Sequence, residues 1–193
     1  IVLENGIKSF SGNSEESVEY YLRLNSNPRV KLIDRTDRKG SGKIKVSDVL
    51  FLNKNLEPIQ EIISGDELWI KIKIDKIESI DYSKLKVGIN FVDSNGNYII
   101  SYLNDEMGYS FKSLENQDEF FLNIPKLYLR AHNYNIRIFM SEVDTRVENF
   151  IDVIENVSEL TVLPGDIWNS NKINRTGSGT IMPGKFMLDE TSH

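Results

Sequence analysis

The sequence predicts an all-β protein, an antiparallel β-sandwich, and three observations carry that prediction. From Lys43 onward, apolar and polar residues alternate in short segments, which is the period of a half-buried strand. Turn-forming groups such as Ser64-Gly65-Asp66 and Asp93-Ser-Asn-Gly-Asn97 separate these segments. Helical spacing of apolar residues is confined to a short stretch near the N-terminus. Short alternating strands with almost no helix are typical of two packed antiparallel sheets.

Residues 1–24 follow a pattern of their own, that of a hairpin and a helix. Residues 1–4 and 7–10 predict two short strands joined by the tight-turn pair Asn5-Gly6. A capped helix is expected over residues 15–22, because acidic residues fill its first turn and apolar residues recur at three-to-four spacing. The segment therefore predicts a hairpin-helix appendage to the sandwich.

The remaining chain divides into a linker, the sandwich and a C-terminal extension. Residues 25–42, with a proline, glycines and several charges, are expected to form the linker. The sandwich is expected over residues 43–163. The extension, residues 164–193, is rich in Gly and Asn, and only residues 180–188 offer an extra strand.

Alternation assigns the strands of the sandwich. The first begins at Ile44 and is expected to contain a bulge near Asp48. The clearest strand covers residues 67–75 and buries every second residue from Leu68 to Ile74. Further strands are expected over residues 85–91, 98–103, 119–124, 134–142 and 159–163.

Charge and composition narrow the function classes. The chain carries 29 acidic and 23 basic residues, a net charge of −6, so it lacks the broad basic field that attracts nucleic acid or anionic lipid. Because it has no cysteine, disulfides, thiolate nucleophiles and cysteine zinc sites are excluded. No apolar run reaches the length of a membrane span and no signal peptide is recognisable, so we expect a cytoplasmic location. The start at Ile1 suggests a fragment with a protein body upstream.

Motifs for catalysis are incomplete. Gly40-Ser-Gly-Lys43 is no phosphate-binding loop, because Asp37 stands where the first glycine is required and Ile44 where Ser or Thr is required. His132 and His193 are too few for a zinc site, and no pair of carboxylates stands out for glycoside hydrolysis. We therefore expect neither an enzyme nor a bound metal or cofactor.

The segment Asp93-Ser-Asn-Gly-Asn97 also resembles the opening of a calcium loop. Its glycine comes two places early, and Asn104 stands where the bidentate Glu of such a loop is needed. The pair Asn95-Gly96 between two alternating segments is better suited to a hairpin turn. A hairpin is therefore expected here, and calcium is the minor alternative.

The outward rows of the predicted sheets carry the most informative residues. Aromatic, amide and basic side chains share this phase: Trp69, Lys71, Asn90, Arg137 and Phe139. A sugar ring has an apolar C–H face edged by hydroxyls, so an aromatic platform flanked by polar groups suits it. We expect a shallow groove in which Asn90, Arg137 and Lys71 bind sugar hydroxyls, and Arg137 or Lys71 binds any phosphate or carboxylate of the glycan. Alternatively, a loop or a neighbouring subunit covers Trp69 and Phe139.

Two sets of residues carry a resemblance to a known family. The opening segment resembles the end of an ABC-transporter ATPase domain, on the residues Gly12, Glu15-Glu16 and Tyr20-Tyr21-Leu22. The rest of the chain resembles the C-terminal domain of Wzt-type O-antigen exporter ATPases. The motifs of that second resemblance follow the family's order: Gly40-Ser-Gly42, Ser64-Gly65-Asp66-Glu67-Leu68, Asp93 with Asn95-Gly96, Tyr134-Asn-Ile-Arg-Ile138, Asp152-Val-Ile-Glu-Asn156 and Val162-Leu-Pro-Gly165-Asp166.

The resemblance implies both a fold and a function. Domains of this family are immunoglobulin-like β-sandwiches that recognise the completed end of a lipid-linked polysaccharide on the cytoplasmic side of the membrane. The upstream ATPase then drives export through a transmembrane permease, so this fragment is expected to bind glycan without hydrolysing ATP. The family forms homodimers by exchange of C-terminal strands, which would give residues 180–188 a role. Teichoic-acid exporters share the architecture, so the glycan class stays open.

Two alternatives from other classes remain open at this point. One is an assembly module that dimerises the transporter ATPase and binds no sugar, in which case Trp69 and Phe139 would be buried between subunits. The other is a glycan-processing enzyme, which would need a cleft with two paired carboxylates.

Overall fold

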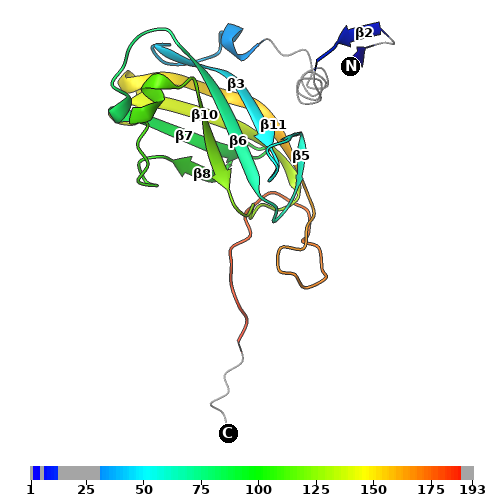
Figure 1. The fold of residues 1–193 in the computed structure, drawn as a ribbon. Coiled ribbons are helices and arrows are strands. Elements are labelled where there is room, and N and C mark those ends of the chain that lie inside the picture. The colour runs from blue at the N-terminus through cyan, green and yellow to red at the C-terminus, as the bar shows by residue number, and fades with distance from the viewer. Residues whose placement is uncertain (1, 5–6, 13–30, 188–193) are drawn as a thin grey trace.

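A computed structural model describes residues 2–4, 7–12 and 31–187, and its main body is a sandwich of two β-sheets (Figure 1). One sheet has the strand order β5-β11-β10-β7-β8 and the other has the order β4-β3-β6-β9. The five-stranded sheet consists of β5 (Glu61–Ile63), β11 (Phe150–Leu163), β10 (His132–Glu142), β7 (Leu85–Val92) and β8 (Tyr98–Leu103). The four-stranded sheet consists of β4 (Pro58–Ile59), β3 (Ile44–Leu52), β6 (Leu68–Lys76) and β9 (Glu119–Ile124). The predicted all-β sandwich is therefore confirmed.

Helical structure within the described residues is limited to short 3-10 turns. They are η1 (Leu32–Asp34), η2 (Tyr82–Lys84), η3 (Lys112–Asn116) and η4 (Val147–Asn149). Neighbouring strands pair antiparallel, except that β5 runs parallel to β11. The chain passes from one sheet to the other between β4 and β5, β5 and β6, β6 and β7, β8 and β9, and β9 and β10. Each sheet therefore depends on segments far apart in the sequence.

The core lies between the two sheets because alternate residues of each strand point inward. In β6, Leu68, Ile70 and Ile72 are completely buried. On the five-stranded sheet, Ile136 and Ile138 of β10 belong to the same buried cluster. Burial of one such side chain contributes about 1.5–3 kcal/mol, so this row of residues holds the sheets together.

Two local predictions are confirmed by the pairing. The register of β3 on β6 shifts between Val46 and Asp48, which is the expected bulge. The segment between β7 and β8 forms the expected hairpin, with Gly96 at a φ of 83°. The Asp93 carboxylate accepts hydrogen bonds from the Asn97 side chain and from the backbone N–H groups of Asn97 and Asn95, and these lower its pKa to about 2. This carboxylate therefore closes a turn.

Strand β11 is longer than the sequence predicts. The expected strand covered residues 159–163, whereas β11 runs from Phe150 to Leu163. Its N-terminal half does not alternate, because all residues from Ile151 to Ile154 are buried. Both faces of this half are covered. Ile151 and Ile154 belong to the core cluster. Val153 pairs with Phe139, which is itself buried, and Asp152 forms an ion pair with Arg38.

The side chain of Tyr134 ties the end of the sandwich to the C-terminal extension. Tyr134 is completely buried, and its hydroxyl donates to the carbonyl of Arg130 at 3.0 Å. The backbone N–H of Gly179 donates to the same hydroxyl at 3.2 Å. A tyrosine that bonds to backbone a few residues upstream is characteristic of immunoglobulin-like sandwiches.

The structure describes only part of each end of the chain. Strands β1 (Val2–Glu4) and β2 (Ile7–Phe10) pair antiparallel, as expected. The predicted helix over residues 15–22 and the first part of the predicted linker lie outside the described residues. At the other end, Thr180 makes one isolated bridge to Leu129, and the described residues that follow, 181–187, form no strand. Ile181 is buried and donates its backbone N–H to the Tyr128 carbonyl, whereas residues 182–187 extend away from the sandwich (Figure 1). The exchange of residues 180–188 between subunits remains a prediction.

Candidate functional site

The five residues predicted from strand phase lie on opposite sides of the sandwich. Trp69 and Lys71 are on β6 of the four-stranded sheet. Asn90 on β7 and Arg137 and Phe139 on β10 belong to the five-stranded sheet. Because the inner faces of the sheets pack together, their outer faces point in opposite directions. The single groove expected for these residues is therefore not formed, and each face has to be considered separately.

On the outer face of the five-stranded sheet, four polar side chains form a continuous hydrogen-bonded row across four strands. Asn90 Nδ2 donates to Ser101 Oγ of β8 at 2.7 Å. Arg137 Nη1 donates to Asn90 Oδ1 at 3.1 Å, and Arg137 Nε donates to Glu155 Oε1 of β11 at 2.8 Å. We call Ser101, Asn90, Arg137 and Glu155 the polar row. Each member is oriented by its neighbours, which is the preorganisation a binding site needs.

Tyr98 completes this face with an exposed aromatic ring. Its side chain is 58% exposed, and the guanidinium carbon of Arg137 lies 5.6 Å from its ring centroid. A cation over an aromatic ring is attracted to it and restricts its motion. Strand phase did not identify Tyr98, because the pairing of β7 with β8 shifts register between Phe91 and Val92. The only sequence signal is its place directly after the hairpin turn.

Phe139 is not an exposed platform, which corrects the prediction for this residue. Its side chain is only 7% exposed, and its ring packs edge-on against Phe150 at 5.2 Å between centroids. Gly88 on the neighbouring strand leaves room for it, since an added Cβ there would lie 3.3 Å from the Phe139 ring. The Arg137 guanidinium carbon lies 5.7 Å from the ring centroid. Phe139 therefore supports Arg137 from within the sheet surface.

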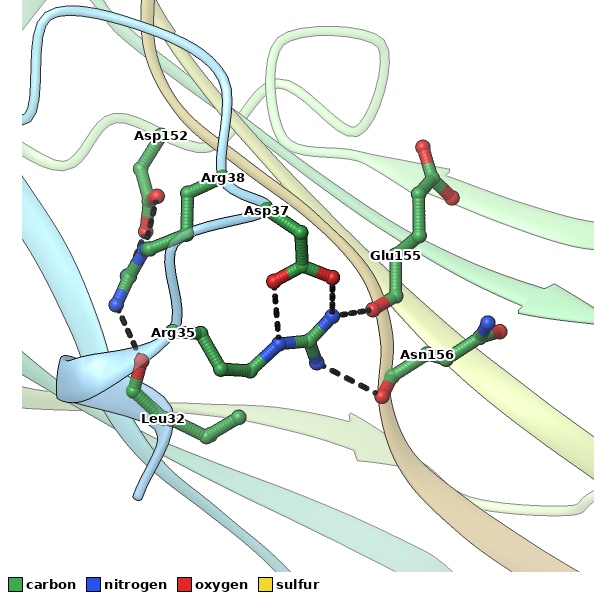
Figure 2. Close-up of polar contacts among 7 residues, drawn as sticks. All are labelled: Leu32, Arg35, Asp37, Arg38, Asp152, Glu155 and Asn156. Carbon is green, nitrogen blue, oxygen red and sulfur yellow. Dashed lines mark hydrogen bonds and ion pairs between the residues drawn. The ribbon is translucent and has the colours of Figure 1, made fainter. Parts of the chain in front are cut away.

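Glu155, at the β11 end of the polar row, comes from a bulge that a distant arginine holds (Figure 2). Opposite Arg137, β10 advances from Ile136 to Ile138 while β11 advances from Ser158 to Ile154. The next residue, Asn156, has a φ of 49°. Arg35, from the segment expected to be a linker, donates to the backbone carbonyls of both Glu155 and Asn156.

On the outer face of the four-stranded sheet, the aromatic residues are arranged differently. Trp69 Nε1 donates to Glu67 Oε1 at 3.0 Å, and its ring meets Phe121 edge-on at 6.3 Å with an interplanar angle of 81°. Lys71 Nζ lies 3.0 Å from Glu119 Oε2 and 5.5 Å from the Phe121 ring centroid. Two nearly perpendicular rings cannot stack on the same sugar face together. We call Trp69, Lys71 and Phe121 the aromatic face.

Two shallow depressions lie near the ends of the β6 strand. One encloses about 540 Å³ and is lined by Lys73, Asp75, Lys76, Asp118 and Glu119, among others. The other encloses about 410 Å³ between β4, β5 and the start of β6, where Asp66 and Glu67 line it. Neither contains a residue of the polar row.

The described part of the chain offers neither a metal site nor a membrane-spanning helix. Within residues 2–4, 7–12 and 31–187, no three His, Asp or Glu side chains are grouped so that they could hold a metal ion. In the same part of the chain, no helix is long and apolar enough to cross a membrane.

Comparison with known proteins gives one family and one fold. The model of the family described as "Wzt C-terminal domain" matches residues 35–178. A crystal structure of the C-terminal domain of Wzt superposes with a TM-score of 0.56 at 13% sequence identity, covering 83% of this chain and 93% of that chain. A crystal structure of a chitin binding domain from Burkholderia pseudomallei covers 58% of this chain and 61% of that one at 13% identity. Its TM-score of 0.32 is too low to show a common fold. Comparison with curated proteins gives no significant match.

Proposed function

Because the chain belongs to the Wzt C-terminal domain family, a family of polysaccharide ABC transporters, we propose that it is the non-catalytic domain that recognises the exported glycan. In this proposal it binds the lipid-linked polysaccharide, by its completed end, on the cytoplasmic side of the membrane. The ATPase domain of the same subunit then powers export through the transmembrane permease. The domain acts as a homodimer, which raises the effective affinity of two weak sugar sites held beside one transporter.

The polar row beside Tyr98 is the observation that carries this proposal. An exposed ring offers a surface for the apolar face of a sugar, and the adjacent amide, hydroxyl, guanidinium and carboxylate groups match its hydroxyls. The groups are already oriented by each other, so binding requires little reordering of side chains. We therefore place the glycan site at Tyr98, Ser101, Asn90, Arg137 and Glu155.

The charges at this surface favour an uncharged sugar. Arg137 is already paired with Glu155, and on the opposite face Lys71 is paired with Glu119. A phosphate or uronate would have to break such a pair, and the net charge of −6 would oppose a polyanionic chain. We therefore favour an O-antigen-like neutral glycan over a teichoic-acid-like one.

Substitutions in the site test the proposal. Tyr98→Ala and Arg137→Ala are each expected to weaken binding of the producing organism's own polysaccharide about tenfold, which corresponds to one lost stacking or charge-assisted contact. Isothermal titration calorimetry of the full chain measures the change. Tyr109→Ala is the matched control for the first variant, because this tyrosine is also 58% exposed but is not part of the site. Wild-type affinity in both site variants would remove these residues from the site.

The aromatic face supports a second candidate function, assembly of the subunits. Phe121 is 45% exposed beside Trp69, and exposed apolar patches mark protein interfaces. If this face joins the subunits, Phe121→Glu abolishes a dimer seen by analytical ultracentrifugation and leaves any glycan binding at a single site unchanged. A pure assembly module forms this dimer and binds no polysaccharide even as the wild type. If Phe121→Glu instead abolishes glycan binding in a monomer, the sugar site lies on this face and our assignment of faces is wrong.

A further inference from the structure

Arg35 anchors the N-terminal segment on the five-stranded sheet through one guanidinium group. Its Nε and Nη2 donate to the Asp37 carboxylate at 2.9 and 2.6 Å. Nη2 also donates to the Glu155 carbonyl at 2.8 Å, and Nη1 donates to the Asn156 carbonyl at 3.0 Å (Figure 2). Asp37 thus fixes the orientation of Arg35, and the planar fork of the guanidinium spans both carbonyls of the bulge.

The same bulge carries the Glu155 carboxylate that holds Arg137. The backbone carbonyl of Glu155 accepts from Arg35, while its side chain accepts from Arg137 Nε. Glu155 therefore connects Arg35 to the polar row, through its backbone carbonyl and its carboxylate. A bulge has no regular ladder to fix its backbone, so contacts from outside the sheet set its conformation.

From these contacts we infer that Arg35 is a positioning residue for the glycan site: it holds the β11 bulge so that Glu155 keeps Arg137 in its binding orientation. The inference rests on the proposed function for its effect on glycan binding. Residues 31–37, which lead into the sandwich, are then physically connected to the polar row through Arg35. Undocking of this segment weakens glycan binding, and by reciprocity bound glycan holds the segment in place.

A double-mutant cycle tests this connection in the full chain. Arg35→Ala is expected to weaken binding of the producing organism's polysaccharide about fivefold to tenfold, the low end of measured coupling between sites. In a Glu155→Ala background, where the connection is already cut, Arg35→Ala should change affinity less than about twofold.

Asp37→Ala is a milder second variant, because Asp37 is exposed and its loss leaves Arg35 present but unsupported. Arg146→Ala is the control, because this exposed arginine pairs with Asp144 and Glu148, which do not belong to the polar row.

An NMR signal measured without glycan tests the role of Arg35 independently of the proposed function. The NMR resonance of the Arg137 Nε–H group is expected to shift in Arg35→Ala and to stay in place in Arg146→Ala. If it stays in place in folded Arg35→Ala, or if the affinity losses of Arg35→Ala and Glu155→Ala simply add, the inference is overturned. If wild-type protein binds no polysaccharide, the proposed function fails, and the Arg137 resonance alone decides the role of Arg35.

Discussion

At the scale of single residues, the joint between the two sheets depends on a buried ion pair. Arg38 donates to both carboxylate oxygens of Asp152 on β11, and the two side chains are 7% and 2% exposed (Figure 2). Arg38 also donates to the carbonyls of Leu32 and of Val46 on β3, whose N–H donates to Asp152. One guanidinium and one carboxylate thus connect η1 and both sheets. Every polar group of this cluster has a partner, which makes the burial of two charges tolerable.

Removal of one partner should be strongly destabilising. Arg38→Met is expected to lower the free energy of unfolding by about 3–5 kcal/mol, because it leaves the Asp152 carboxylate buried without a cation. The matched variant Arg146→Met removes an arginine whose side chain is 70% exposed and should lower it by less than about 1 kcal/mol. Urea denaturation of both variants measures the difference. Equal small losses would show that Asp152 is not buried as described.

At the scale of elements, residues 39–42 act as a short extra strand on the edge of β11. Lys39 exchanges both backbone hydrogen bonds with Val153, and the N–H groups of Ser41 and Gly42 donate to the carbonyls of Phe150 and Ile151. At the other end of the same edge, β5 pairs with residues 161–163. An edge strand covered in this way is protected from pairing with other chains.

Gly40 makes this close approach possible. Its φ is 118°, and an added Cβ would lie 2.6 Å from the backbone of Ile151. Gly40→Ala is therefore expected to lower the free energy of unfolding by about 2–4 kcal/mol, the sum of backbone strain and a steric clash. Gly177→Ala separates the two causes, because Gly177 has a φ of 130° but no atom within 4 Å of an added Cβ. Thermal unfolding compares them, and an equal loss in both variants would mean that the clash is absent.

The strands also show which parts of the fold the sequence pattern predicts. Alternation predicted β6 closely because every second residue from Leu68 to Ile74 is buried. The predicted bounds of β8 and β9 also match the observed strands. It failed for the first half of β11, where both faces of the strand are covered. It treated residues 31–42 as a linker, since the partners of Arg35 and Arg38 lie more than a hundred residues away in the sequence.

The same limit of the alternation pattern explains which of the predicted site residues lie together. Strand phase identifies which residues point outward, and Asn90 and Arg137 do form part of one row. It does not reveal to which of two sheets a strand belongs, so Trp69 and Lys71 were grouped with residues of the opposite face. Burial by neighbouring residues is likewise invisible in the pattern, which places Phe139 on an exposed platform although its side chain is buried.

At the scale of the whole molecule, the sandwich has two outer faces with different chemistry. The five-stranded face presents oriented hydrogen-bonding groups around one exposed tyrosine, which suits a hydroxyl-rich ligand. The four-stranded face presents Trp69 and Phe121 nearly perpendicular to each other, which suits packing against protein. A domain of this design can hold a glycan on one face while the other face contacts a second subunit. The segment that enters the sandwich docks on the five-stranded sheet, close to the proposed site.

The most direct test of the central claim is an NMR titration of the full chain with the producing organism's own surface polysaccharide. The account predicts that resonances of Tyr98, Asn90, Ser101 and Arg137 shift with saturable binding, and that removal of the glycan's terminal residues weakens the effect. Resonances of Trp69 and Phe121 should remain in place at the same concentrations. No shift at millimolar sugar, or shifts confined to Trp69 and Phe121, would contradict the assignment of the glycan site to the five-stranded sheet.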